Sequence, residues 1–293
     1  MSRPTSEGRV KILGFDLNYS IFGKPVNGTI LTLHGGPGLD HQYMLPLADL
    51  AEHGFRVVFY DQLACGASER TRDIGLFTVE RAVREVEAVR AQLKLGKVHL
   101  IGSSYGGLLA LEYAIQYQKN LRTLTTIGGV SSMPLVIAEM QRMKSQLPPE
   151  TLEVLEAHEA RGEYTDPEYQ RALMTFYRRH FCRLEKWPKE LNSSLSNANP
   201  LIISTMNGPT EFTVVGGLRY WDNRSRLHGI RVPTLILCGI HDEVSPKEAR
   251  AISRRIKGSR RFVFPNSSHL AMWEQREACI STIQDFLSAN LPE

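Results

Sequence analysis

The chain has 293 residues, of which 42% are hydrophobic and 23% charged, and its 35 basic and 31 acidic side chains leave a net charge of +4. This length and composition are ordinary for a soluble globular protein and leave room for one large α/β domain, or for a core domain with an insert. The small positive charge gives little support to a nucleic-acid partner, because the best basic cluster has no interleaved aromatic residues and no recognition motif. We interpret this cluster as the solvated face of a late helix and its following loop: Arg254, Arg255, Lys257, Arg260 and Arg261.

Cysteine usage and the amino-terminal sequence bear on metal sites and on the compartment. The four cysteines are scattered without C-x-x-C spacing, which argues against a zinc site or a disulfide framework: Cys65, Cys182, Cys238 and Cys279. Residues 1–24 carry charges throughout and lack an apolar stretch, so no secretory signal is expected. No part of the chain approaches the ~18 consecutive apolar residues that a membrane span requires. These observations favour a cytoplasmic location and no membrane partner.

The first half of the chain alternates between strand and helix patterns. Residues 10–22 indicate two short antiparallel strands around Gly14. Apolar, β-branched or aromatic runs then predict strands at 29–33, 56–60, 98–101 and 121–127. Thr78 is the expected N-cap of an intervening helix, whose apolar face carries Val79, Val83, Val86, Val89 and Leu93. Short strands that alternate with helices predict parallel βαβ units and hence a doubly wound sheet.

The alternation stops in the middle of the chain and then resumes. Residues 133–221 are mainly helical and polar in pattern and contain no run typical of a core strand. Strands are expected again at 234–237 and 261–264, with helices near 246–256 and 272–287. We therefore predict an α/β core formed by residues 1–132 and 222–293, interrupted by a helical cap at 133–221. Such a cap would lie over the carboxyl ends of the strands, where ligands bind in sheets of this kind.

Ser104 is the first candidate for chemistry. It is the centre of a G-x-S-x-G pattern in the run 102–107, GSSYGG, which follows the strand pattern 97–101 and precedes a helix pattern at 108–118. Small residues on both sides permit a sharp strand-to-helix turn that exposes the serine hydroxyl above the sheet. Glycine and serine are also common in ordinary turns, so the pattern alone leaves a plain turn open.

A serine hydroxyl is a poor nucleophile near neutral pH and needs a base, which in turn needs an orienting acid. Asp242 follows the predicted strand 234–237, and His269 follows the predicted strand 261–264. The chain order serine, acid, histidine is the one that accompanies this kind of serine turn. Since all three loops open at the same edge of the sheet, we predict a catalytic triad of Ser104, Asp242 and His269.

Other histidines and one further aspartate are weaker candidates. His241 could be the base, but a residue next to the acid rarely reaches the nucleophile. His99 lies inside a predicted strand, where a hydrogen-bonded core histidine is the simpler interpretation. Asp61 also follows a strand, and we expect a structural role for it. The remaining histidines show no catalytic spacing: His41, His53, His158, His180 and His228.

The run 33–38, LHGGPG, follows an early strand and is the expected oxyanion hole. Acyl transfer needs backbone N–H groups directed at the developing alkoxide, and glycines let the backbone approach the substrate without a Cβ atom in the way. We assign the N–H groups of Gly36 and of Tyr105, the residue after the nucleophile. The alternative is a flexible turn without a role in catalysis.

With these residues in view, the chain resembles the prolyl aminopeptidase (proline iminopeptidase) family of α/β-hydrolases, and most of all its tricorn-interacting aminopeptidase branch. The matching segments span nearly the whole chain, including the insert: 34–38, 60–62, 102–107, 206–212, 242–246 and 268–274. The resemblance implies the α/β-hydrolase fold, a triad at Ser104, Asp242 and His269, and the release of N-terminal residues, above all proline, from short peptides without a metal or other cofactor. One departure is the run 63–68, LACGAS, where family members often carry an arginine and a further glycine. Any charge contact made by such an arginine is in doubt here.

The resemblance also implies two glutamates that hold the free amino terminus of the substrate, at Glu211 and Glu243. A charged ammonium in a partly closed site is costly unless it is paired, and two carboxylates would also fix which peptide bond reaches Ser104. The plainer alternative is that both are ordinary surface carboxylates. Tyr105 and Trp273 are candidate residues of the pocket for the N-terminal side chain, although a core role for Trp273 is an equal alternative.

Two other functions remain open at this point. The same triad would serve an amidase acting on amino-acid amides, or a hydrolase of small esters. The second is a binding protein with an inactive hydrolase fold, but such proteins usually lack a triad member and none is missing here. The sequence gives no indication of the oligomeric state, the preferred N-terminal residue or movement of the cap.

Overall fold

The computed structural model describes residues 3–291, and its centre is one eight-stranded sheet in the order β1-β2-β4-β3-β5-β6-β7-β8. The strands are β1 (Ser6–Ile12), β2 (Phe15–Phe22), β3 (Gly28–Leu33), β4 (Phe55–Tyr60), β5 (Val98–Ser103), β6 (Leu121–Ile127), β7 (Thr234–Gly239) and β8 (Arg260–Phe264). The β1–β2 and β2–β4 pairs are antiparallel, and the five pairs from β4–β3 to β7–β8 are parallel. The predicted mostly parallel, doubly wound sheet is therefore confirmed.

Helices cover both faces of the sheet. The helices around the sheet are η1 (His41–His53), α1 (Val79–Gln92), α2 (Tyr105–Tyr117), α8 (Ser245–Ser253), α9 (Ala271–Glu274) and α10 (Arg276–Ser288). Three-residue turns lie at η2 (Ile74–Leu76), η3 (Gln118–Asn120) and η4 (Leu227–Gly229). Side chains alternate across each strand, so β4 sends Val58 and Tyr60 into the hydrophobic cluster under α1 and α2, and Val57 and Phe59 into the cluster under η1 and α10. Apolar strands buried on both faces are what a parallel sheet requires.

Helix α1 shows how closely local sequence determines this layer. The Thr78 side chain accepts a hydrogen bond from the Arg81 N–H at 3.2 Å and caps the helix, as predicted. Val83, Val86 and Val89 are fully buried on its inner face. The helix predicted at 272–287 is instead broken in two at Gln275, whose backbone leaves the helical region with φ −131° and ψ 54°.

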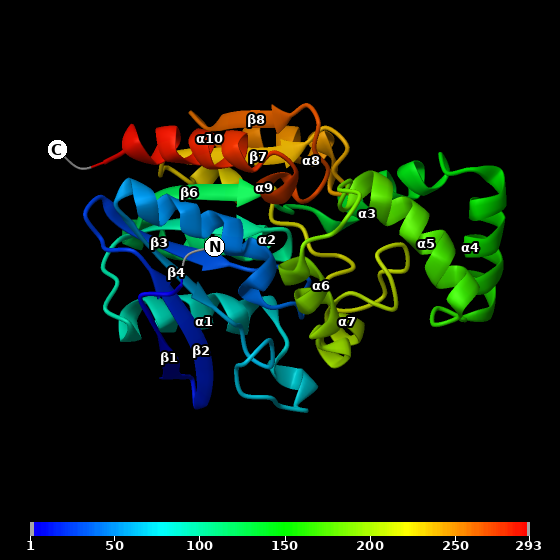
Figure 1. Ribbon diagram of the computed structural model, residues 1–293, viewed down its shortest axis with the longest axis horizontal. Coiled ribbons are helices and arrows are strands. Elements are labelled where there is room, and N and C mark those ends of the chain that lie inside the picture. The colour runs from blue at the N-terminus through cyan, green and yellow to red at the C-terminus, as the bar shows by residue number, and fades with distance from the viewer. Residues whose placement is uncertain (1–2, 292–293) are drawn as a thin grey trace.

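The chain leaves the sheet after β6 and returns to it at β7. Between these strands lie α3 (Met133–Lys144), α4 (Pro149–Arg161), α5 (Pro167–His180), α6 (Lys189–Ser196) and α7 (Pro200–Met206). Figure 1 shows them gathered beyond the arrowheads of β6, β7 and β8, at the carboxyl edge of the sheet. Ser132 and Asp222 form an isolated β-bridge, so this segment begins and ends at one place. The domain bounds 1–132, 133–221 and 222–293 stay a prediction.

Two further features concern the surface of the molecule. The five residues of the basic cluster are exposed. Three of them lie in the loop between α8, which ends at Ser253, and β8, and the other two are the first residues of β8, Arg260 and Arg261. Within residues 3–291, no helix combines the length and the apolar character needed to cross a bilayer.

Candidate active site

Ser104 lies in the tight turn between β5 and α2. Its backbone has φ 57° and ψ −123°, a conformation that a residue with a side chain rarely adopts. The flanking glycines allow this turn, because a Cβ atom on Gly102 would lie 2.1 Å from the Gly106 carbonyl oxygen and one on Gly106 would lie 2.0 Å from that of Leu33. The Ser104 N–H donates to the Ile127 carbonyl of the neighbouring strand at 2.9 Å, which fixes the turn at the sheet edge.

His269 and Asp242 meet at the same edge. His269 lies in the loop between β8 and α9, Asp242 follows β7, and the His269 Nδ1 atom is 2.7 Å from Asp242 Oδ1. Both side chains are buried. Burial alone would lower the pKa of His269, but the charge of Asp242 and its hydrogen bond outweigh burial and raise that pKa to about 9.

Neighbouring side chains hold the histidine loop in place. The Glu274 carboxylate accepts from the Ser268 N–H at 2.6 Å, and Gln275 Oε1 accepts from the Asn266 N–H at 2.8 Å. The Gln275 contact lies at the break between α9 and α10, where the Gln275 backbone leaves the helical region. The last residue of α5 adds a further support, since the His180 carbonyl accepts from the His269 N–H at 3.1 Å.

The backbone donors predicted for an oxyanion lie beside Ser104. Gly36 and Tyr105 line the same cavity as Ser104, and a Cβ atom on Gly35 would lie 2.7 Å from the Ser104 Cβ atom. The Gly35 N–H is already used, because it donates to the Tyr43 hydroxyl at 2.7 Å. Tyr105 is the first residue of α2, so its N–H has no acceptor within the helix.

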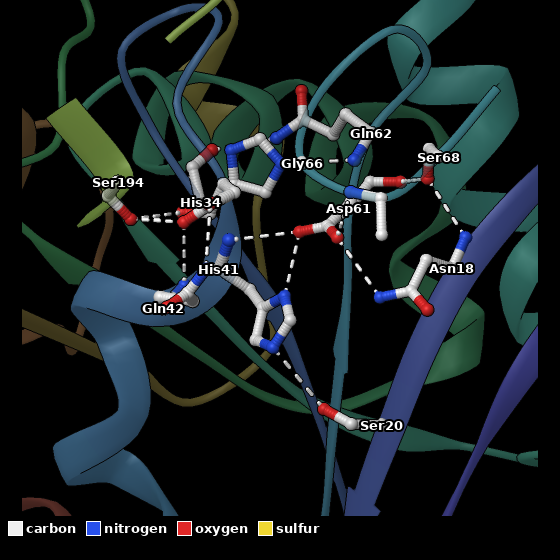
Figure 2. A network of polar contacts seen from close by, with 12 residues as sticks. Asn18, Ser20, His34, His41, Gln42, Asp61, Gln62, Gly66, Ser68 and Ser194 are labelled. Carbon is white, nitrogen blue, oxygen red and sulfur yellow. Dashed lines mark hydrogen bonds and ion pairs between the residues drawn. The ribbon is translucent and has the colours of Figure 1, made fainter. Parts of the chain in front are cut away.

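A buried polar network supports this glycine loop from below (Figure 2). Asp61 accepts from His41 Nδ1 at 2.7 Å and from the His41 N–H at 3.1 Å, directly after the loop. Burial would raise the pKa of Asp61, but the hydrogen bond and charge of His41 outweigh burial and hold that pKa well below its usual value. His34 Nε2 accepts from the Gln62 N–H at 3.0 Å, and Gln62 Nε2 donates to the His34 carbonyl at 2.7 Å. Asp61 therefore supports the loop, in line with the structural role expected for it.

The structure brings Glu211 and Glu243 to the cavity that Ser104 and His269 line. Glu211 follows α7 in the cap, and its Oε2 atom accepts from the Tyr177 hydroxyl at 2.6 Å. Glu243 is buried, with Oε1 3.9 Å from His269 Nε2 and with no hydrogen-bond partner for Oε2 among residues 3–291. Burial raises the pKa of Glu243 to about 8; the charge of His269 opposes this shift, and the charges of Glu211 and Asp242 add to it.

Comparison with known proteins identifies the family. The family model described as alpha/beta hydrolase fold matches residues 28–275. A proline iminopeptidase from Thermoplasma volcanium is 43% identical over 289 residues, which are 97% of this chain and 97% of that protein. The chain belongs to the proline iminopeptidase family of α/β-hydrolases.

Solved structures agree with this assignment. The crystal structure of a proline iminopeptidase from Mycobacterium smegmatis has a TM-score of 0.91 and 34% identity, and the match covers 97% of this chain and 98% of the other. The crystal structure of VinJ has a TM-score of 0.96 and 33% identity, with 99% and 100% covered. The predicted resemblance and the α/β-hydrolase fold are thereby confirmed.

The cavity of this family member has a volume of about 470 Å³ and a largely apolar lining. Tyr105 lines it, as predicted. Trp273 does not, so the pocket role predicted for it is wrong and the alternative of a core role holds: its indole N–H donates to the Tyr43 carbonyl at 2.6 Å, and its ring packs against the hydrophobic cluster under η1 and α10. Instead the cap supplies aromatic side chains that the sequence analysis missed: Tyr177, Phe181 and Trp187.

The run 63–68, where family members often carry an arginine, makes backbone contacts in this chain. Arg70 reaches it from outside the run and donates to the Ala64 carbonyl at 2.6 Å and to the Gly66 carbonyl at 3.3 Å. A guanidinium group is therefore present near this turn, bound to carbonyl oxygens.

Among residues 3–291, none of the other candidate histidines lines this cavity. His99 Nδ1 is 2.9 Å from Thr123 Oγ1, but Nε2 is buried without a partner among the described residues, so the expectation of a fully hydrogen-bonded core histidine is half right. Burial, helped by the charge of Arg122, lowers the pKa of His99 to about 4. The His241 carbonyl oxygen, rather than its ring, makes the contact with His180, at 2.9 Å from His180 Nδ1.

One group of side chains has the composition of a metal site. Ligand atoms of His158, Asp166 and Glu168 lie within 4.8 Å of one another at the α4–α5 turn. The Asp166 carboxylate accepts from the Glu168 N–H at 2.7 Å and caps α5, so capping of the helix explains the position of Asp166.

The four cysteines are buried and free.

Proposed function

We propose that this chain is a serine aminopeptidase that releases N-terminal proline, or another small apolar residue, from short peptides through an acyl-enzyme. The observation that carries the proposal is one cavity lined by a serine in a strained turn, by a histidine paired with a buried aspartate, and by two carboxylates. The names of the relatives support the same activity. No side chain required for it is missing.

In the first step, Ser104 Oγ attacks the carbonyl carbon of the first peptide bond while His269 Nε2 takes the hydroxyl proton. Asp242, 2.7 Å from Nδ1, orients the ring and stabilises the imidazolium that forms. The N–H groups of Gly36 and Tyr105 stabilise the oxyanion. The imidazolium then gives its proton to the leaving amine as the C–N bond breaks. Water, activated by the same ring, hydrolyses the ester at Ser104.

The two carboxylates give this reaction its exopeptidase character. The substrate ammonium would bind between Glu211 and Glu243, where the unpartnered Oε2 of Glu243 can accept a hydrogen bond. A charged hydrogen bond in a buried site is strong, so the amine anchor would fix which carbonyl carbon lies next to Ser104. Because burial raises the pKa of Glu243 to about 8, an arriving ammonium would favour its ionised form and release a proton near neutral pH.

The test is turnover of proline and alanine 2-naphthylamides by the purified protein, with S104A as the control. We expect release of naphthylamine from both substrates, and labelling of Ser104 by a fluorophosphonate. Cleavage of small esters without turnover of either naphthylamide would refute the aminopeptidase assignment. A failure of the fluorophosphonate to label Ser104 would indicate a binding protein.

The alternative is an amino-acid amidase or small-ester hydrolase with the same triad. Chain length separates the two, because an aminopeptidase should prefer Pro-Xaa dipeptides and tripeptides to prolinamide. A preference for prolinamide would support the amidase.

We also propose a cytoplasmic location, with peptides rather than nucleic acid or membrane as partners. Four buried, free cysteines are compatible with a reducing compartment. Cell fractionation with antibodies against the protein tests this location, and recovery in a membrane pellet would contradict it.

A further inference from the structure

The end of cap helix α5 contacts three residues of the candidate site, Glu211, Glu243 and His269. Helix α5 runs from the α4 side of the cap toward the carboxyl edge of the sheet (Figure 1). Tyr177 and His180 lie in its last turn and Phe181 directly follows it, and their spacing of three and four positions places them on one side. Tyr177 and Phe181 also line the cavity.

The first contact of this turn is with the amine anchor. The Tyr177 hydroxyl donates to Glu211 Oε2 at 2.6 Å. Within residues 3–291, no other side chain donates a hydrogen bond to the Glu211 carboxylate. Burial, and then the charge of Glu211, raises the pKa of Tyr177 well above its usual value, so the hydroxyl keeps its proton and stays a donor. Glu211 belongs to an irregular segment after α7, whereas Tyr177 belongs to a regular helix. The helix therefore fixes the loop carboxylate.

The second set of contacts is with the catalytic loops. The His180 carbonyl accepts from the Glu243 N–H at 3.2 Å and from the His269 N–H at 3.1 Å, so one oxygen joins the loops after β7 and β8. The Phe181 ring stacks on the His269 imidazole, with centroids 5.9 Å apart and planes 29° from parallel. One rigid helical turn thus connects Glu211, Glu243 and the general base.

We propose that Tyr177 is a positioning residue for recognition of the free amino terminus: it fixes Glu211, and the last turn of α5 sets the distance from that anchor to His269. The inference rests on the proposed aminopeptidase function. Without the Tyr177 hydroxyl, the Glu211 carboxylate loses its donor and can rotate away from the position in which an ammonium is shared with Glu243. The triad itself keeps its contacts, because His180 and Phe181 are unchanged.

The test compares wild type, Y177F, E211Q and the double variant on two readouts. The first is kcat and KM for proline 2-naphthylamide, which needs the amine anchor. The second is the rate of Ser104 labelling by a fluorophosphonate, which needs only the triad. Y113F is the matched control, since Tyr113 is a buried tyrosine in α2 whose hydroxyl donates to Glu87 Oε2 at 2.5 Å and does not line the cavity.

We expect Y177F to lower kcat/KM for the naphthylamide about 10- to 100-fold, mainly through KM, as for loss of a hydrogen bond to a charged group. Labelling of Ser104 should stay within about twofold of wild type, and Y113F should match wild type on both readouts. In the E211Q background, Y177F should have no further effect, because Tyr177 acts through that carboxylate.

Three results would overturn the proposal: wild-type kinetics for Y177F, equal losses on the two readouts, or losses that multiply with those of E211Q. If Y177F fails to fold by circular dichroism, E211D gives the same test, since it keeps the charge but withdraws the carboxylate from the hydroxyl. Wild-type KM for E211D would then refute the proposal. A wild-type protein that is labelled at Ser104 but does not cleave the naphthylamide refutes the aminopeptidase function instead.

Discussion

His269 lies between two carboxylates, with Nδ1 2.7 Å from Asp242 Oδ1 and Nε2 3.9 Å from Glu243 Oε1. The Asp242 side is expected in a catalytic triad. On the other side, Nε2 is the atom that takes the serine proton in the proposed mechanism, and Glu243 lies next to it. The charge of Glu243 therefore adds to that of Asp242 in raising the pKa of His269. The proposed amine anchor and the proposed general base are therefore electrostatically coupled.

The first prediction concerns this coupling. E243Q removes a negative charge that favours the imidazolium, so the pKa of His269 should fall from about 9 by about 1 unit or more. Only the neutral ring can act as a base, so the rise of kcat/KM with pH should move to lower pH. The measurement is the pH–rate profile with an N-acetylated ester, which has no ammonium to bind.

The control for this profile is E150Q, which removes an exposed carboxylate in α4. Its profile should superimpose on that of wild type. An E243Q profile that does not move, or that moves to higher pH, would show that Glu243 has no influence on the base.

The second prediction concerns substrates with and without a free amine. E243Q should weaken transition-state binding of alanine 2-naphthylamide by about 2–5 kcal/mol, because it leaves a buried ammonium with one carboxylate instead of two. The control substrate is an N-acetylated ester measured at pH 9.5, where the base is largely neutral in either protein. For this ester, kcat/KM should fall less than tenfold in E243Q. Equal losses on both substrates would assign Glu243 to the triad rather than to amine recognition.

The parts of this site that local sequence encodes could be predicted. Strand β5, the glycines around Ser104 and the order of Asp242 and His269 after their strands are all properties of short segments, and they led to the correct sheet edge. The pairing of His269 with Asp242 then follows from parallel strands that end at one edge.

The contribution of the cap could not be predicted in the same way. Tyr177 bonds a residue 34 positions away, and Phe181 stacks on one 88 positions away, through a helix whose own pattern shows only an apolar face. Trp273 shows the converse case, because it was an aromatic candidate for the pocket and its side chain does not line the cavity. The turn into α9 directs its indole to the Tyr43 carbonyl instead. Tertiary packing decides both cases.

The third prediction uses a glycine beside the base. Gly128 has φ +56°, and a Cβ atom there would lie 2.7 Å from His269 Cε1 and Nδ1. G128A should displace the imidazole and reduce kcat/KM about 100-fold on every substrate, as small misplacements of a catalytic group do. The control is G162A at φ +70° with open space around it, which should lower stability by about 1 kcal/mol and leave activity unchanged. G128A with activity within tenfold of wild type would contradict the position of the ring.

The fourth prediction concerns the buried pair below the glycine loop. Asp61 and His41 are 2.7 Å apart, and D61N would leave the imidazolium without its partner (Figure 2). Loss of a buried ion pair by removal of one member costs about 3 kcal/mol of unfolding free energy. Since the loop of Gly36 ends next to this pair, we also expect a lower kcat with little change in KM.

The pH dependence of this effect has a definite sign. The pKa of Asp61 is lowered on folding, so its contribution to stability is present above its unfolded pKa, near 4, and is lost as the pH falls. Burial would lower the pKa of His41, but the hydrogen bond and charge of Asp61 outweigh burial and raise it. The contribution of His41 to stability is therefore fully present below its unfolded pKa of about 6.5, and it is lost as the pH rises through the pKa of the folded state. The stability difference between wild type and D61N, measured by urea unfolding, should therefore be largest between about pH 4 and 6.5. A difference that is constant from pH 4 to 9 would show that the two side chains are joined by a neutral hydrogen bond and not by an ion pair.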